Sequence, residues 1–162
     1  MHRAHFDTDD FFWLPTRPPY EKKRERSERR ELLQSALERA SSWILSGSLC
    51  GWGDCVIPMF DLVVFLWVPS HTRLERLVKR EVERYGPEIL NPADPRHEAH
   101  RKFMEWAAAY DDGVGSNMRC KVLHEEWMTH LPCPVLRLEG DRPTSENMDA
   151  LLSFVDEGSR KR

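Results

Sequence analysis

An uninterrupted apolar run near the middle of the chain constrains the fold more than any other feature. The run extends from Leu62 to Val68, between Asp61 and Pro69. It is far shorter than the ~20 residues of a membrane-spanning helix and has the length of a buried strand. Because its apolar residues are continuous rather than alternating, we expect helices to cover both faces of this strand, as in a parallel sheet.

The rest of the chain alternates between short strand-like segments and longer helix-like segments. The predicted strands are residues 4–7, 43–47, 62–68 and 134–139. The predicted helices are residues 21–40, a helix capped by Ser70 or Thr72 that ends at Tyr85, residues 97–110, residues 116–130, and a closing helix from Thr144 or Ser145. This alternation predicts an α/β fold with a parallel sheet flanked by helices. We expect one domain over residues 1–157 and a frayed tail at 158–162.

Composition narrows the class of protein. Charged residues make up 31% of the chain, apolar residues make up 40%, and the formal net charge is -3. These values are ordinary for a globular protein and give no reason to expect nucleic acid or a membrane as partner. The four cysteines form no dense disulfide framework, and the N-terminus has no apolar signal-peptide core. We therefore expect reduced thiols and a cytoplasmic location.

Polar residues follow each predicted strand, and in a parallel α/β sheet the carboxyl ends of the strands form the binding edge. The residues in question are Asp7, Asp9 and Asp10, then Gly47, Ser48 and Trp52, then the arginines of the helix after Pro69, and finally Gly140, Asp141 and Arg142. Carboxylates can hold a metal ion directly or through water, and arginines can neutralise phosphate charge. The combination is typical of a metal-assisted phosphate site.

In this order and spacing, the motifs resemble the body of P-loop small-molecule kinases of the adenylate- and shikimate-kinase-like kind. Phe6-Asp7-Thr8-Asp9 is similar to the aromatic-D-x-D strand end of these enzymes, and Ser46-Gly47-Ser48 resembles their glycine-rich substrate loop. Leu77-x-x-Arg80 looks like the helix arginine that leads into the lid. Gly140-Asp141-Arg142-Pro143 resembles the adenine-side loop before the last helix.

The resemblance implies transfer of the γ-phosphoryl group of ATP to a small-molecule acceptor, with Mg²⁺ as the metal. Asp7 would orient Mg²⁺ through water, and Asp9 would hold the acceptor. The acceptor site would also include Asp10, an added acid without a clear family role, together with Gly47, Ser48 and Trp52. On the nucleotide side, Arg80 and Arg84 would close over ATP, and Asp141 and Arg142 would lie near the adenine.

One motif of these kinases is missing. The phosphate-binding sequence G-x-x-x-x-G-K-[ST] occurs nowhere in the chain, and only Met1 to His5 precede Phe6. We therefore expect a first strand, its phosphate loop and a helix to be absent, with the strand belonging between residues 43–47 and 62–68. Without them, the backbone amides and the lysine that hold the phosphates are lost, and two inner strand edges have no partner. We expect no turnover from this chain alone.

Three readings of the missing segment stay open. The natural protein begins upstream, or the chain is an inactive truncated product, or it is a binding module. Such a module would rearrange its sheet or borrow a strand from a partner. In each reading, the unpaired strand edges favour self-association. The site motifs also have simpler structural readings. Asp7 and Asp9 can cap a helix, the Gly47 loop can be a structural turn, and some arginines of the helix after Pro69 can form surface ion pairs of little energetic value.

Overall fold

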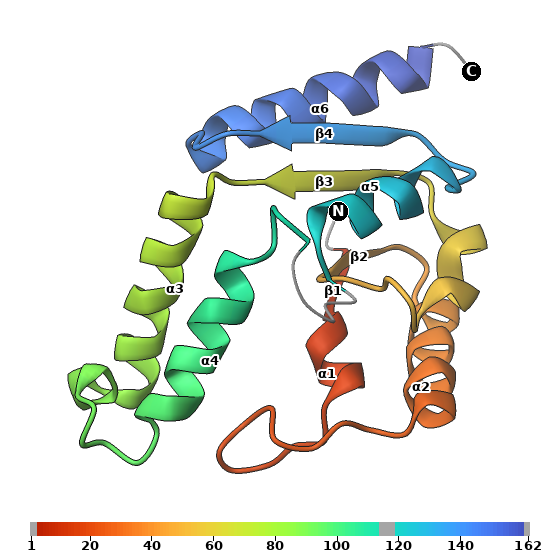
Figure 1. The fold of residues 1–162 in the computed structure, drawn as a ribbon. Helices are drawn as coiled ribbons and strands as arrows, with labels where there is room; N and C mark the ends of the chain where they lie inside the picture. The colour runs from red at the N-terminus through yellow and green to blue at the C-terminus, as the bar shows by residue number, and fades with distance from the viewer. Residues whose placement is uncertain (1–2, 114–118, 161–162) are drawn as a thin grey trace. The chain divides into compact units, whose positions relative to one another are not determined.

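The computed structural model describes residues 3–113 and 119–160 (Figure 1). The elements follow the order β1 (Ala4–Asp7), α1 (Thr8–Phe12), α2 (Arg26–Arg39), β2 (Trp43–Ser46), η1 (Asp54–Met59), β3 (Val63–Trp67), α3 (Ser70–Tyr85), η2 (Pro87–Leu90), α4 (His97–Ala108), α5 (Lys121–Thr129), β4 (Val135–Glu139) and α6 (Thr144–Arg160). The mixed α/β class and all four predicted strands are confirmed. No helix in the described part of the chain combines the length and the apolar character that crossing a bilayer requires.

Several helix boundaries differ from the predicted ones. The helix predicted over 116–130 is observed as α5, which begins at Lys121, while residues 116–118 lie outside the described residues. Helix α3 begins directly after Pro69 without a side-chain cap, so neither Ser70 nor Thr72 has the predicted capping role. Helix α6 continues to Arg160 and so includes the first residues of the tail predicted at 158–162, whose last two residues lie outside the described residues.

The chain divides into two compact units. Unit 1 consists of Met1–Phe60 and His130–Pro132, and unit 2 consists of Asp61–Thr129 and Cys133–Arg162. The boundary after Phe60 comes just before β3. Strands β1 and β2 therefore belong to unit 1, and β3 and β4 belong to unit 2.

Unit 1 contains a parallel β1–β2 pair connected by α2. Its register aligns Ala4 with Trp43 and Asp7 with Ser46. Leu33 and Leu37 of α2 lie one helical turn apart and are both buried. Helix α2 begins at Arg26 rather than at Glu21 because the preceding backbone bonds across the loop: the Leu14 amide donates to Lys22 O (2.8 Å) and the Arg24 amide donates to Phe12 O (2.9 Å).

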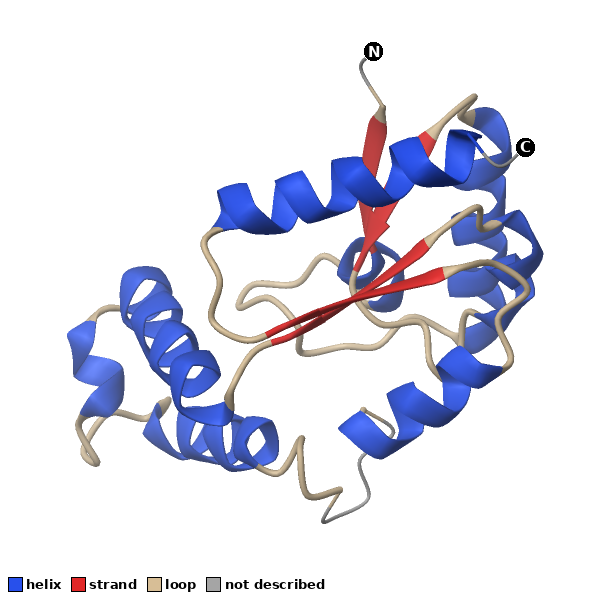
Figure 2. Ribbon diagram, turned by 90° about the horizontal axis from the view of Figure 1, so that it is seen from above, coloured by secondary structure: helices blue, strands red, loops and turns tan. Residues whose placement is uncertain are grey.

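Unit 2 contains a parallel β3–β4 pair, and α6 lies along it (Figure 1 and Figure 2). The register aligns Phe65 with Arg137 and Leu66 with Leu138, and aligned residues of a parallel pair point to the same face. Phe65 is buried, whereas Val64 and Leu66 on the opposite face are 40% and 58% exposed. The prediction that both faces of this strand are covered is therefore wrong: α6 packs against β4, and the face of β3 that carries Val64 and Leu66 is exposed.

The strands of this chain form two separate pairs rather than one sheet. Among residues 3–113 and 119–160, β2 is paired only with β1, and β3 is paired only with β4. One edge of β2 and one edge of β3 therefore present backbone groups that no described strand pairs.

Candidate functional site

Asp7 ends β1 and caps the short helix α1. Its Oδ1 accepts a hydrogen bond from the Asp9 amide at 2.9 Å, which is the geometry of a helix N-cap. This confirms the capping reading for Asp7. The side chains of Asp9 and Asp10 have no ion pair or hydrogen bond with any described residue, and Asp10 is exposed. The cap thus holds Asp9 at the end of β1 and leaves its carboxylate available to a ligand.

The Gly47 loop leaves β2 beside the end of β1. Gly47 has a φ of +107°, and a Cβ at this position would lie 1.8 Å from Thr8 Oγ1. Trp52 is only 2% exposed, and its Nε1 donates to Ser48 O at 3.0 Å. Trp52 is therefore an anchor of the loop, and little of its ring is accessible to a ligand in this structure.

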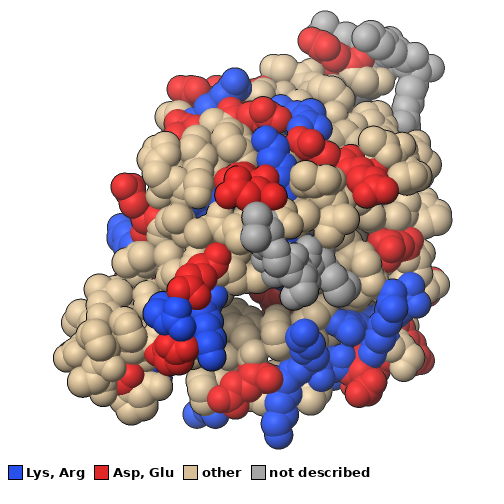
Figure 3. All heavy atoms as spheres, viewed as in Figure 1, with Lys and Arg blue, Asp and Glu red and all other residues tan. Residues whose placement is uncertain are grey.

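Arginines of α2 hold the same loop from outside, a role that the sequence analysis missed. Arg26 donates to Gly51 O at 2.7 Å, and Arg30 donates through Nε to Trp52 O at 2.8 Å. The Arg29 guanidinium lies 4.2 Å from the centre of the Phe12 ring. Figure 3 shows Lys and Arg side chains, with fewer acidic ones among them, at the lower right, the part of the view that α2 occupies in Figure 1.

Unit 2 contains a cavity of about 330 Å³ at the carboxyl end of β3. Its lining residues come from β3, from α3 and from the segment after α4: Leu66, Trp67, Val68, Arg73, Arg76, Leu77, Arg80 and Tyr110. The three arginines lie at helical spacing on one side of α3. The cavity thus occupies the strand end at which ligands bind in α/β folds and combines aromatic, apolar and cationic groups.

One wall of the cavity is fixed by Asp111. Arg73 donates to Asp111 Oδ2 at 2.8 Å, and Trp67 Nε1 donates to Asp111 Oδ1 at 2.8 Å. Burial raises the pKa of Asp111, but the hydrogen bonds from Arg73 and Trp67 outweigh it and hold this pKa below its usual value. The Arg73 guanidinium also lies 5.0 Å from the Tyr110 ring.

Tyr110 is held in turn by a histidine. Its Oη is 2.8 Å from His124 Nδ1. Burial, and to a lesser extent the charge of Arg119, lower the pKa of His124. Both effects favour the neutral imidazole, which can form this hydrogen bond without an added charge.

The other two arginines of the cavity differ in their partners. Arg76 forms an ion pair with Asp141 at 2.7 Å, and Thr72 Oγ1 donates to the other oxygen of Asp141 over 3.4 Å. Arg80 is exposed and has no ion pair or hydrogen bond with the described residues.

The predicted nucleotide-side residues are therefore brought together only in part. Arg80 lines the cavity and Asp141 bonds to an arginine that lines it, whereas Arg84 and Arg142 do not line it. The Arg84 guanidinium lies instead 5.9 Å from the Tyr85 ring. The sequence analysis did not identify Trp67, Tyr110 or Asp111 as members of this site.

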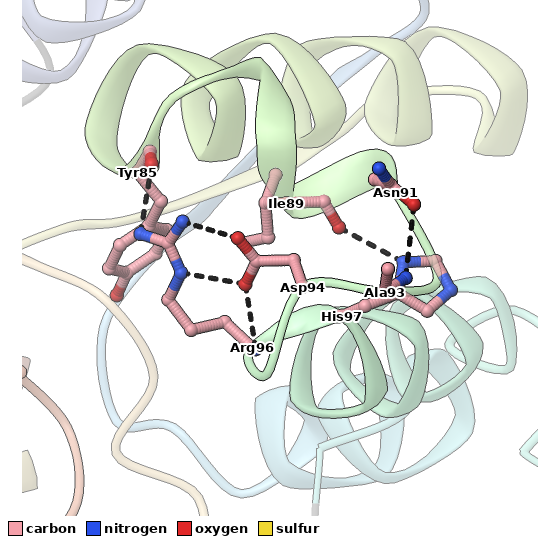
Figure 4. A network of polar contacts seen from close by, with 7 residues as sticks. All are labelled: Tyr85, Ile89, Asn91, Ala93, Asp94, Arg96 and His97. Atoms are coloured by element: carbon pink, nitrogen blue, oxygen red, sulfur yellow. Dashed lines mark hydrogen bonds and ion pairs between the residues drawn. The ribbon is translucent and has the colours of Figure 1, made fainter.

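A separate polar network fixes the connection between η2 and α4 (Figure 4). Asp94 accepts from the side chain of Arg96 through both oxygens, at 2.9 and 2.7 Å, and from its amide at 2.8 Å. The side-chain hydrogen bonds from Arg96 lower the pKa of Asp94 to about 2. Arg96 also donates to Tyr85 O at 3.0 Å, which ties the end of α3 to the start of α4. Both oxygens of Asp94 already accept hydrogen bonds from Arg96, so we interpret this network as structural.

Comparison with known proteins found one close relative. The uncharacterized protein YqaC of Bacillus subtilis (strain 168) is 47% identical over 155 residues, which are 96% of this chain and 84% of the relative. No family model matches the chain. No solved structure matches it either.

Proposed function

Because this chain belongs to the family of the uncharacterized Bacillus subtilis protein YqaC, whose name assigns no activity, we propose a function from residues and geometry. The chain is the acceptor and nucleotide side of an ATP-dependent small-molecule kinase. The phosphate-binding loop would have to be supplied by a segment with the sequence G-x-x-x-x-G-K-[ST], which the 162 residues do not contain. Without that segment the chain does not turn over ATP.

The pairing of the strands carries this proposal. The family resemblance places the strand before the phosphate loop between the strands at Trp43 and Val63. Among the described residues, β2 pairs only with β1 and β3 pairs only with β4, so each strand has an edge that a further strand can pair. A strand added at the edge of β3 would pair the backbone groups that no described strand pairs.

The apolar face of β3 supports the same conclusion. Val64 and Leu66 are exposed side by side on one face, although exposed apolar groups of this size are favourable to bury, at about 25 cal/mol per Å². Neighbouring exposed apolar residues commonly mark a contact surface. A helix that follows the phosphate loop would cover them, just as α6 covers the β4 side of the pair.

The proposed roles of the site residues follow from their surroundings. Asp9 has a carboxylate without a partner among the described residues, so it can orient the acceptor hydroxyl, with Asp10 beside it in the chain. In unit 2, the cavity takes the nucleotide: Trp67 and Tyr110 offer aromatic surfaces for the base, and Arg80 offers a positive charge for a phosphate.

The donor set fits a weakly held Mg²⁺. Asp7 uses one oxygen for the α1 cap, and its second oxygen accepts no hydrogen bond among the described residues. The described residues contain no group of three or more potential metal ligands. Mg²⁺ suits such a site because it usually keeps several waters and binds through one carboxylate and the substrate phosphates. When bound, the ion would neutralise phosphate charge.

The experiment is to complete the chain and measure turnover. The part of the relative that lies outside the matched region would be joined to this chain. ADP release would be measured with hydroxylated and phosphorylated metabolites as acceptors, beside the 162-residue chain as control. We expect acceptor-dependent ADP release from the completed chain alone. If the added segment contains no phosphate loop and the 162-residue chain still binds ATP, the protein is a nucleotide-binding module instead.

A further inference from the structure

The three arginines of the unit 2 cavity are neutralised to different degrees. Arg73 and Asp111 form a partly shielded pair, with side chains 20% and 25% exposed. Arg76 and Asp141 form a solvent-facing pair, with side chains 60% and 51% exposed. Arg80 has no acidic partner among the described residues. The cavity therefore offers one unneutralised cation and a second whose partner is held only at the surface.

The two ion pairs differ in how easily a ligand could replace the carboxylate. Arg73 also donates to Val68 O at 3.0 Å, and Asp111 also accepts from Trp67, so this pair is part of the wall. The Arg76–Asp141 pair has a single short contact, and the Thr72 hydrogen bond to Asp141 is long at 3.4 Å. Exposed ion pairs contribute little to stability. Asp141 is thus the acid that can exchange.

The Asp141 side chain has room to move because it is 51% exposed. Gly140 precedes it with a φ of +103°. The Gly140 amide donates to Trp67 O at 3.0 Å and keeps the loop anchored at the end of β3. The Asp141 side chain can therefore turn away from Arg76 while the backbone stays in place.

From these contacts, we infer that Asp141 is a built-in competitor for the phosphate group that the cavity binds. A phosphate oxygen offers arginine the same type of acceptor as a carboxylate and carries more charge. In the free protein Asp141 neutralises Arg76, and a bound phosphate takes its place while a second phosphate oxygen meets Arg80. The ligand is a phosphate ester with a planar ring, because Trp67 and Tyr110 line the same cavity. The identity of this ligand as a nucleotide rests on the proposed function, whereas the competition does not.

The test is a binding titration of the 162-residue chain, followed by tryptophan fluorescence or calorimetry. The probes are ATP, inorganic tripolyphosphate and adenosine. In Asp141→Asn, we expect ATP and tripolyphosphate to bind about two- to fivefold more tightly, since only an exposed ion pair is removed. Adenosine binding should not change. Arg80→Ala should bind both phosphates about tenfold more weakly or worse.

Two controls separate competition from a general charge effect. Glu139→Gln removes the same charge from a neighbouring exposed carboxylate, which pairs with Arg137 at 3.2 Å and does not line the cavity. It should leave all three affinities unchanged. In the Arg76→Ala background, adding Asp141→Asn should not change phosphate affinity further, because the arginine for which Asp141 and the phosphate compete is absent.

Three results would overturn the inference: unchanged or weaker phosphate binding by Asp141→Asn, an equal gain from Glu139→Gln, or no saturable binding of ATP and tripolyphosphate to either the wild type or Asp141→Asn. Weaker binding would make Asp141 a direct ligand contact. The proposed function fails separately, through absent turnover of the completed chain. If Asp141→Asn binds tripolyphosphate more tightly but the completed chain does not turn over ATP, this inference is supported and the proposed kinase function is wrong.

Discussion

Gly47, which directly follows β2, packs closely against Thr8, which directly follows β1. A Cβ at position 47 would lie 1.8 Å from Thr8 Oγ1. Thr8 is itself buried, so it cannot move aside into solvent. The φ of +107° at Gly47 is also a conformation that only glycine adopts without strain. Position 47 therefore needs glycine for reasons of structure, whatever the loop binds.

Gly47→Ala should destabilise the protein. The positive φ alone costs roughly 1–3 kcal/mol, and the overlap with Thr8 adds to it. The free energy of unfolding from urea titration would measure the loss. Gly158→Ala is the matched control, because it lies in α6 with nothing within 4 Å of its Cβ and should be neutral or slightly stabilising. Equal stability of Gly47→Ala and the wild type would contradict the observed closeness of the strand ends.

Asp7 has a structural role that can be separated from its proposed metal role. Asp7→Ala removes the α1 cap and should cost about 1 kcal/mol of unfolding free energy. Asp7→Asn keeps a cap of nearly equal quality and should retain stability. In the completed chain, the same Asp7→Asn should raise the Mg²⁺ concentration needed for half-maximal turnover, because the amide is a weaker ligand for the ion's water shell. If the Mg²⁺ dependence is unchanged, Asp7 caps α1 but does not contribute to Mg²⁺ binding.

The Asp94–Arg96 network gives a pH dependence with a definite sign. The pKa of Asp94 is about 2 in the folded protein, against an ordinary 3.8, because of the hydrogen bonds from Arg96. A lowered folded-state pKa means that the stabilisation is complete above pH 3.8 and is lost as the pH falls through about 2. The stability difference between the wild type and Asp94→Asn should therefore shrink in this window. Asp149→Asn, on the exposed side of α6, is the control and should show no such trend.

Most of the fold could be predicted because its signals are local. The strands β2, β3 and β4 are each followed within two residues by one that a strand tolerates poorly: Gly47, Pro69 and Gly140. The start of α2 could not be predicted, since the residues before it are held extended by a bridge between Trp13 and Lys23. The exposed face of β3 could not be predicted either. A continuous apolar run indicates that both faces of a strand can be buried, but it does not show which elements cover them.

The site was less accessible to sequence reasoning than the fold. Gly47 and Asp7 are prominent in the sequence, and both have clear structural roles in the structure. The wall of the cavity depends instead on Arg73 and Asp111, which are separated by two helices in the chain. A salt bridge between such distant residues has no sequence signature. The sequence analysis did name the helix after Pro69 as a source of arginines, but only the structure distinguishes the paired Arg76 from Arg80.

The proposed acceptor role of Asp9 makes the sharpest functional prediction. Its carboxylate has no partner among the described residues, so Asp9→Asn should leave the unfolding free energy within about 0.5 kcal/mol of the wild type. In the completed chain, the same change should abolish acceptor-dependent ADP release while ATP binding stays intact, because an amide cannot take the acceptor's proton. Asp10→Asn is the matched control: it removes a neighbouring exposed carboxylate and should lower turnover much less. Full turnover by Asp9→Asn would move the acceptor site away from the end of β1 and leave its free carboxylate unexplained.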